Sequence, residues 1–143
     1  MFDTATFKVL DIQHFPIITV RNYAIRAGYA MQWAREMDVL VAHGRPFVML
    51  YVEPPDNEAH EDFRQRGQWL KQNKEALARV CTMLITVEPD DDRREEARVR
   101  GRGATRAFGI PHRAVGTLAE ALDLVSYRAP MFSGNGRLGR RSS

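Results

Sequence analysis

The sequence predicts a single α/β domain with a mostly parallel central sheet of about five strands flanked by about four helices. The first observation is the apolar run Phe47–Val52, which is the longest in the chain and carries no charge. Such a run is typical of a strand that is buried on both faces of a parallel sheet. Pro54 and Pro55 end it, because proline cannot donate to a sheet ladder. A second apolar run, Met83–Val87, is followed by Pro89 in the same way.

The remaining strands are predicted at three shorter segments. Phe7–Ile12 and Ile17–Val20 are less apolar, which suits strands nearer the sheet edge, and Gln13–Pro16 between them is short enough for a hairpin-like turn. A short last strand is predicted at His112–Val115. Parallel strands need crossover connections, so the segments between them should supply helices.

The first two helices are predicted from apolar residues at three- and four-residue spacing. Gly44 should end the first helix, whose apolar stripe consists of Ala30, Trp33, Met37, Leu40 and Val41. Asp56 or Asn57 is expected to cap the second helix, whose stripe consists of Phe63, Gly67, Leu70 and Leu77.

The last two helices are predicted from their start signals. Asp90–Asp92 are expected to begin the third helix, where carboxylates are favoured by the helix dipole, and Gly101 and Gly103 are expected to interrupt or loosen it. The capping box from Thr117 to Glu120 begins the fourth, whose apolar face consists of Leu118, Ala121, Leu122 and Val125.

Length and charge indicate one domain at residues 1–126 and a flexible basic tail at residues 127–143. The 143-residue chain has a net charge of +3, but the tail holds four arginines and no acid, which leaves the body at −1. A nearly neutral body does not indicate a general nucleic-acid-binding surface. The single cysteine, Cys81, excludes an internal disulfide and is expected to be a buried structural thiol. No apolar run reaches the roughly 20 residues of a membrane span, and no signal peptide is recognisable, so a cytoplasmic protein is expected.

The order of these elements resembles the STAS domains, and within them the SpoIIAA-like group of small bacterial proteins. The resemblance covers residues 5–126 and depends on the early strand pair, on the two buried strands and on the ending Phe108–Val115 with Leu118–Leu122. It implies a small regulatory module that binds a protein partner or a ligand. The anti-sigma antagonists of this family carry a phosphorylatable serine in the turn after the central strand. Here that turn is Glu53–Asn57, and residues 45–80 contain no serine or threonine, which excludes such a switch.

Acidic side chains follow both buried strands, with Glu53, Asp56 and Glu58 after the first and Glu88 and Asp90 to Asp92 after the second. Because the carboxyl ends of parallel strands line the usual ligand crevice, these carboxylates could hold Mg²⁺. His60 could then serve as a general base. No ligand spacing is diagnostic, so solvated helix starts and a surface histidine are the favoured interpretations, and no metal or cofactor is predicted.

Two further features have competing interpretations. The arginines between Arg93 and Arg106 invite an anion-binding hypothesis, but the neighbouring acids favour a solvated helix with salt bridges. Trp69 does not share the Phe63–Leu70 stripe, so it is expected to be partly exposed and to contribute to partner contact.

The leading hypothesis is a non-enzymatic interaction module for a protein partner or a small ligand, with self-association left open. The alternative is metal- or carboxylate-assisted hydrolysis at Glu53, Asp56, Glu88 and Asp90. Nucleic-acid association through the arginine-rich tail is a third hypothesis and is disfavoured. The candidate binding residues are Glu53, Asp56, Asn57, His60, Trp69, Glu88, Asp90, Arg137, Arg140 and Arg141.

Overall fold

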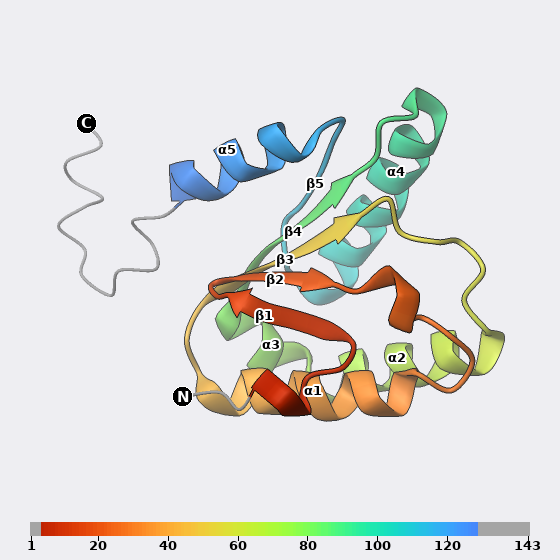
Figure 1. Ribbon diagram of the computed structural model, residues 1–143, viewed down its shortest axis with the longest axis vertical. Coiled ribbons are helices and arrows are strands. Elements are labelled where there is room, and N and C mark those ends of the chain that lie inside the picture. Colours follow the sequence, from red (N-terminus) through yellow and green to blue (C-terminus); the bar gives the residue numbers. More distant parts are fainter. Residues whose placement is uncertain (1–3, 129–143) are drawn as a thin grey trace, which may run out of the picture.

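The computed structural model describes residues 4–128, which form an α/β domain around one five-stranded sheet (Figure 1). The strands lie side by side in the order in which they occur along the chain. The first two are antiparallel, and every later pair is parallel. The strands are β1 (Leu10–His14), β2 (Ile17–Val20), β3 (Phe47–Val52), β4 (Cys81–Val87) and β5 (His112–Val115). The predicted fold class and the mostly parallel sheet are therefore confirmed.

Five α-helices connect and follow the strands, rather than about four. The helices are α1 (Ala30–His43), α2 (His60–Gln72), α3 (Lys74–Val80), α4 (Asp91–Phe108) and α5 (Leu118–Arg128). Two short 3₁₀ turns lie at Thr4–Thr6 and Asn22–Ala24. Within residues 4–128, none of the helices combines the length and apolarity that a membrane crossing requires.

The two faces of the sheet carry different layers, because alternate residues of a strand point to opposite faces. On one face, Phe47 and Met49 of β3 join the larger hydrophobic cluster with residues of α1, α2 and α3. On the other face, Val48 and Leu50 join a smaller cluster that includes Ala121 and Val125 of α5. Figure 1 shows α5 on the opposite side of the sheet from α1, α2 and α3.

Several predicted boundaries are confirmed with the expected local chemistry. Gly44 ends α1 in the left-handed conformation (φ 79°), and its N–H donates to the Leu40 carbonyl. Asp90 caps α4, because its side chain accepts from the Arg93 N–H at 2.9 Å. The Glu120 N–H donates to Thr117 Oγ1 at 3.1 Å, and the Thr117 N–H donates to Glu120 Oε1 at 3.0 Å, which completes the capping box.

The first strand begins later than the predicted Phe7. The carboxylate of Glu36 in α1 is buried and accepts hydrogen bonds from the backbone N–H groups of Lys8, Val9 and Leu10. A helix side chain therefore satisfies the amides that a longer strand would have offered to a neighbour. β1 starts at Leu10 and continues to His14.

The predicted second helix is wrong in three respects. It begins at His60 after an extended Ala59, so neither Asp56 nor Asn57 caps it. It is divided at Asn73, and α3 begins at Lys74. Phe63, which was placed on its apolar stripe, is 61% exposed.

Two expectations about the later helices are also wrong. Helix α4 continues through Gly101 and Gly103 without interruption. In α5, Ala121 and Val125 are buried as expected, but Leu118 and Leu122 are 47% and 43% exposed. Helix α5 extends to Arg128, and the rest of the predicted tail lies outside the described residues.

Candidate functional site

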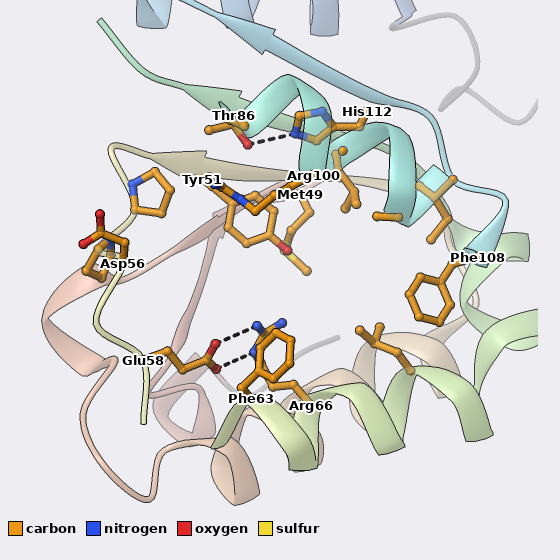
Figure 2. Close-up of a pocket in the computed structure, with 18 of the residues that line it drawn as sticks. Met49, Tyr51, Asp56, Glu58, Phe63, Arg66, Thr86, Arg100, Phe108 and His112 are labelled. Atoms are coloured by element: carbon orange, nitrogen blue, oxygen red, sulfur yellow. Dashed lines mark hydrogen bonds and ion pairs between the residues drawn. The ribbon is translucent and has the colours of Figure 1, made fainter. Parts of the chain in front are cut away.

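A cavity of about 670 Å³ lies between α2 and α4, with β3 and β4 as its floor (Figure 2). Ligand pockets in proteins typically measure about 300–1,000 Å³, so its volume suits a small organic molecule. The floor follows from strand register, because Met49 of β3 pairs with Leu84 of β4, and Tyr51 pairs with Thr86. These residues point to the same face as Phe47 and away from α5.

The cavity changes from polar to apolar along its length. Moving along β3 and β4, the lining changes from Met49 and Leu84 to Tyr51 and Thr86. Along α2 and α4 the order is reversed. Polar residues line the cavity near the start of each helix, and Leu70 and Phe108 line it further along. We call one group the polar end, and it comprises Tyr51, Asp56, Glu58, Arg66, Glu88, Arg93, Glu96 and Arg100. The other group is the apolar end, and it comprises Met37, Met49, Leu70, Leu77, Leu84, Ala104, Phe108 and Ile110.

Figure 2 shows this separation directly, with Asp56 and Glu58 on one side of the cavity and Phe108 on the opposite side. It arises because the starts of α2 and α4 follow the carboxyl ends of β3 and β4. Helix starts are rich in acids here, and the strand ends are closed by Pro54 and Pro89. The fold therefore collects the charged residues of several distant segments at one edge of the sheet.

A hydrogen-bonded ion pair between Glu58 and Arg66 dominates the polar end. Arg66 Nε and Nη2 donate to the two carboxylate oxygens of Glu58 at 2.6 and 2.8 Å, and the Tyr29 hydroxyl donates to the same carboxylate. The Arg66 guanidinium also lies over the rings of Trp33 and Phe63, at 5.8 and 6.0 Å from their centroids. The group is thus fixed on three sides, while Nη1 takes no part in the pair with Glu58.

The pKa values of this cluster follow from burial and pairing. Burial opposes ionisation of both Glu58 and Arg66. The hydrogen bonds and ion pair that join them outweigh burial, so the pKa of Glu58 is lowered and that of Arg66 is raised. Burial raises the pKa of Tyr51 to about 12. Tyr51 therefore stays protonated at neutral pH and keeps a hydroxyl proton to donate.

The Tyr51 hydroxyl and Arg66 share the same open space. Figure 2 shows both groups directed into the gap between α2 and α4. Among the described residues, no side chain or backbone group hydrogen-bonds to the Tyr51 hydroxyl. It is consequently available to a molecule that occupies the cavity.

His112 of β5 closes the cavity beside α4. One of its ring nitrogens, Nε2, lies 2.9 Å from Thr86 Oγ1. Burial, assisted by the positive charges of Arg100 and Arg98, lowers the pKa of His112, so the imidazole is neutral at pH 7. The ring fits against α4 only because Gly101 has no side chain, since a Cβ there would lie 1.9 Å from His112 Nδ1.

The two acidic loops are brought together, but an arginine lies between them. Arg93 Nε donates to Glu88 at 3.1 Å, and Arg93 Nη1 donates to Asp56 at 3.0 Å. Within the described part of the chain, no three His, Cys, Asp or Glu side chains converge as a metal site. Arg93 thus forms ion pairs with two of the four carboxylates that the hydrolase hypothesis assigned to catalysis, Asp56 and Glu88.

The predicted site residues have different positions. Asp56, His60 and Glu88 line the cavity. Asn57 and Asp90 do not line it, and Asp90 caps α4 instead. Glu53 is exposed beside it with a left-handed backbone (φ 45°), and its N–H donates to the Val87 carbonyl.

The expectation that Trp69 is exposed is wrong. It is only 7% exposed, its Nε1 donates to Asp38 at 2.8 Å, and its ring packs edge-on against Trp33. The helix presents this face to α1 because Asp62, one of its buried residues, accepts from the Gly28 and Ala30 N–H groups. The three tail arginines, Arg137, Arg140 and Arg141, lie outside the described residues.

Other interpretations from the sequence are supported. Cys81 is buried, and burial raises the pKa of its thiol to about 12, as expected for a structural cysteine. The arginine-rich helix is partly neutralised, because Arg94 pairs with Asp91 and Arg98 pairs with Glu95.

Sequence reasoning missed Tyr51 and Arg66 as site residues, and it considered Arg100 only within the anion-binding hypothesis for Arg93–Arg106, which it disfavoured. Tyr51 was counted as part of the apolar run, although it is the only polar side chain within Phe47–Val52. Arg66 lies at a helical position that carries no motif. No protein-family model, curated protein or solved structure matches the chain.

Proposed function

We propose that the domain is a non-enzymatic module that binds one small amphipathic molecule in the cavity between α2 and α4. The observation that carries the proposal is the polar-to-apolar gradient inside a cavity of ligand size. The apolar part of the ligand lies against Met49, Leu84 and Phe108. Its polar group lies near Tyr51 and Arg66. The resemblance to STAS domains stays a prediction, and a small ligand-binding module agrees with it.

No chemical step is assigned to the cavity. His112 is neutral but engaged with Thr86, Glu58 is paired with Arg66, and Cys81 is a buried thiol of high pKa. Thr86 and His112 form a hydroxyl–imidazole contact, but within residues 4–128 no third side chain hydrogen-bonds to His112 Nδ1 to orient the imidazole as a catalytic base. Binding is therefore favoured over hydrolysis.

The experiment is a titration with 8-anilinonaphthalene-1-sulfonate, an apolar fluorophore with one charged group. We expect saturable binding to one site, accompanied by a change in tryptophan emission, because Trp33 lines the cavity. Ala104→Phe places a ring in the cavity from α4 and should abolish binding. Ala107→Phe is the matched control, because it adds the same ring to the same helix at an exposed position that does not line the cavity.

Cooperative thermal unfolding of both variants shows that they are folded, since the dye also binds partly unfolded proteins. Equal dye binding by folded Ala104→Phe and by the parent protein would place the dye elsewhere and contradict the proposal.

A further inference from the structure

The arginines and acids that line the cavity differ in whether they form ion pairs. The lining contains three arginines, Arg66, Arg93 and Arg100, and four acids. Arg66 is paired with Glu58, and Arg93 is shared by Glu88 and Asp56. Within residues 4–128, Arg100 has no carboxylate at ion-pair distance, although Glu96 lies one helical turn before it. The guanidinium of Arg100 is thus exposed and held in no ion pair in the described chain, although four acids against three arginines give the lining a net charge of −1.

Neutral and cationic donors accompany this charge. The Tyr51 hydroxyl is protonated and without a partner in the described chain, and Arg66 retains Nη1. Donors in a partly desolvated site are worth more to an anion than the same groups in water. All three residues line the same cavity.

A cationic ligand is disfavoured by the same geometry. The aromatic faces that would attract a cation belong to Trp33 and Phe63, and the Arg66 guanidinium already lies over both. Among the lining acids, Glu96 is the one that forms no ion pair within residues 4–128, and like Arg100 it is exposed and hydrated.

We propose that the ligand is an aliphatic monocarboxylate, whose head group receives hydrogen bonds from Tyr51 and Arg66 and is balanced by Arg100. This inference rests on the proposed function and specifies its ligand class. The apolar end accepts the aliphatic chain. A single negative charge fits better than a phosphate dianion, because Asp56, Glu58, Glu88 and Glu96 surround the polar end and repel additional negative charge.

The test compares decanoate, decanol and decylamine at pH 7, which share one aliphatic chain and differ in their head group. Affinities are measured by displacement of the anilinonaphthalene dye and by calorimetry. We expect decanoate to bind most tightly, decanol next and decylamine most weakly. Higher salt should weaken the binding of decanoate and leave the binding of decanol almost unchanged.

Three variants locate the head group. Arg100→Gln should weaken decanoate about tenfold, which corresponds to about 1.4 kcal/mol, and should leave decanol unchanged. Tyr51→Phe keeps the ring and removes the hydroxyl, and it should weaken decanoate severalfold. Arg102→Gln is the matched control, because it removes the same charge from an exposed position on the same helix that does not line the cavity.

The outcomes separate the two proposals. If all three probes bind equally and Ala104→Phe blocks them, the cavity binds an apolar molecule and the carboxylate inference is wrong. Tightest binding by decylamine, or equal loss of decanoate in Arg100→Gln and Arg102→Gln, would also overturn it. If none of the probes binds, the proposed function fails together with the inference.

Discussion

At the scale of single residues, the contact between Gly101 and His112 shows how one missing side chain shapes the site. A Cβ on residue 101 would lie 1.9 Å from His112 Nδ1 and 2.3 Å from His112 Cγ. Because Cγ lies on the Cβ–Cγ axis, rotation of the imidazole ring about that bond cannot remove this clash. The glycine thus lets α4 approach β5 closely enough to enclose the cavity.

We predict that Gly101→Ala destabilises the protein by about 1–3 kcal/mol through overpacking. This is the net effect after the roughly 1 kcal/mol by which alanine is more favourable than glycine inside a helix. Gly103→Ala is the control, because nothing lies within 4 Å of a Cβ there, and it should stabilise by about 0.5–1 kcal/mol. Urea denaturation measures both. A stabilised Gly101→Ala would show that α4 does not press against His112.

At the scale of the elements, the connection from β3 to α2 is fixed by ionic contacts at two of its three acids. Asp56 accepts from Arg93 of α4, and Glu58 accepts from Arg66 of α2 and from Tyr29. The loop therefore joins the two helices that enclose the cavity. Its position depends on the protonation state of Glu58.

We predict that Glu58→Gln lowers stability at neutral pH and has a smaller effect in acid. The pKa of Glu58 is lower in the folded protein, so its ion pair contributes fully above the unfolded carboxyl pKa of about 4.3. That contribution is lost as the pH falls through the lower folded value. Denaturant unfolding of both proteins between pH 7 and about pH 3 measures the difference. A stability difference that is constant over this range would mean that the ion pair is not formed in solution.

The elements also show what local sequence patterns can predict. The two central strands and α1 were predicted to within one or two residues, because apolar periodicity and Gly44 act locally. The start of β1, the division at Asn73 and the continuity of α4 were not predicted. The first depends on the contact of Glu36 with Val9, and the third accompanies the packing of Gly101 against His112. At the division, the Asn73 side chain donates to the Trp69 carbonyl, a local contact that no sequence motif announces.

The candidate site, too, was predictable only in part. The acidic loops were correctly placed at the strand ends, since this follows from the topology of parallel sheets. The partners of those acids were not predictable, because no motif marks the arginines. Arg66 lies eight residues from Glu58, and Arg93 lies five residues from Glu88 and 37 from Asp56. Trp69 was misplaced for a related reason, since α2 is oriented by its own residue Asp62, which accepts from the N–H groups of Gly28 and Ala30.

At the scale of the whole molecule, the sheet separates a face that is packed from a face that encloses the cavity. Met49 and Leu50 are neighbours on β3 and are 1% and 3% exposed. Leu50 packs in the cluster beneath α5, whereas Met49 belongs to the cavity floor. The same truncation at the two positions therefore compares the two faces within one strand.

We predict that Leu50→Ala destabilises by about 2–5 kcal/mol, because it leaves a new hole in a packed layer. Met49→Ala should cost less, since it enlarges a cavity that already exists. For decanoate affinity the order should reverse. Met49→Ala should weaken binding by roughly fourfold for each methylene-sized contact that is lost, and Leu50→Ala should leave binding unchanged. Urea denaturation and the dye-displacement titration measure the two effects. Equal loss of affinity in the two variants would place the ligand on the α5 side or outside the cavity.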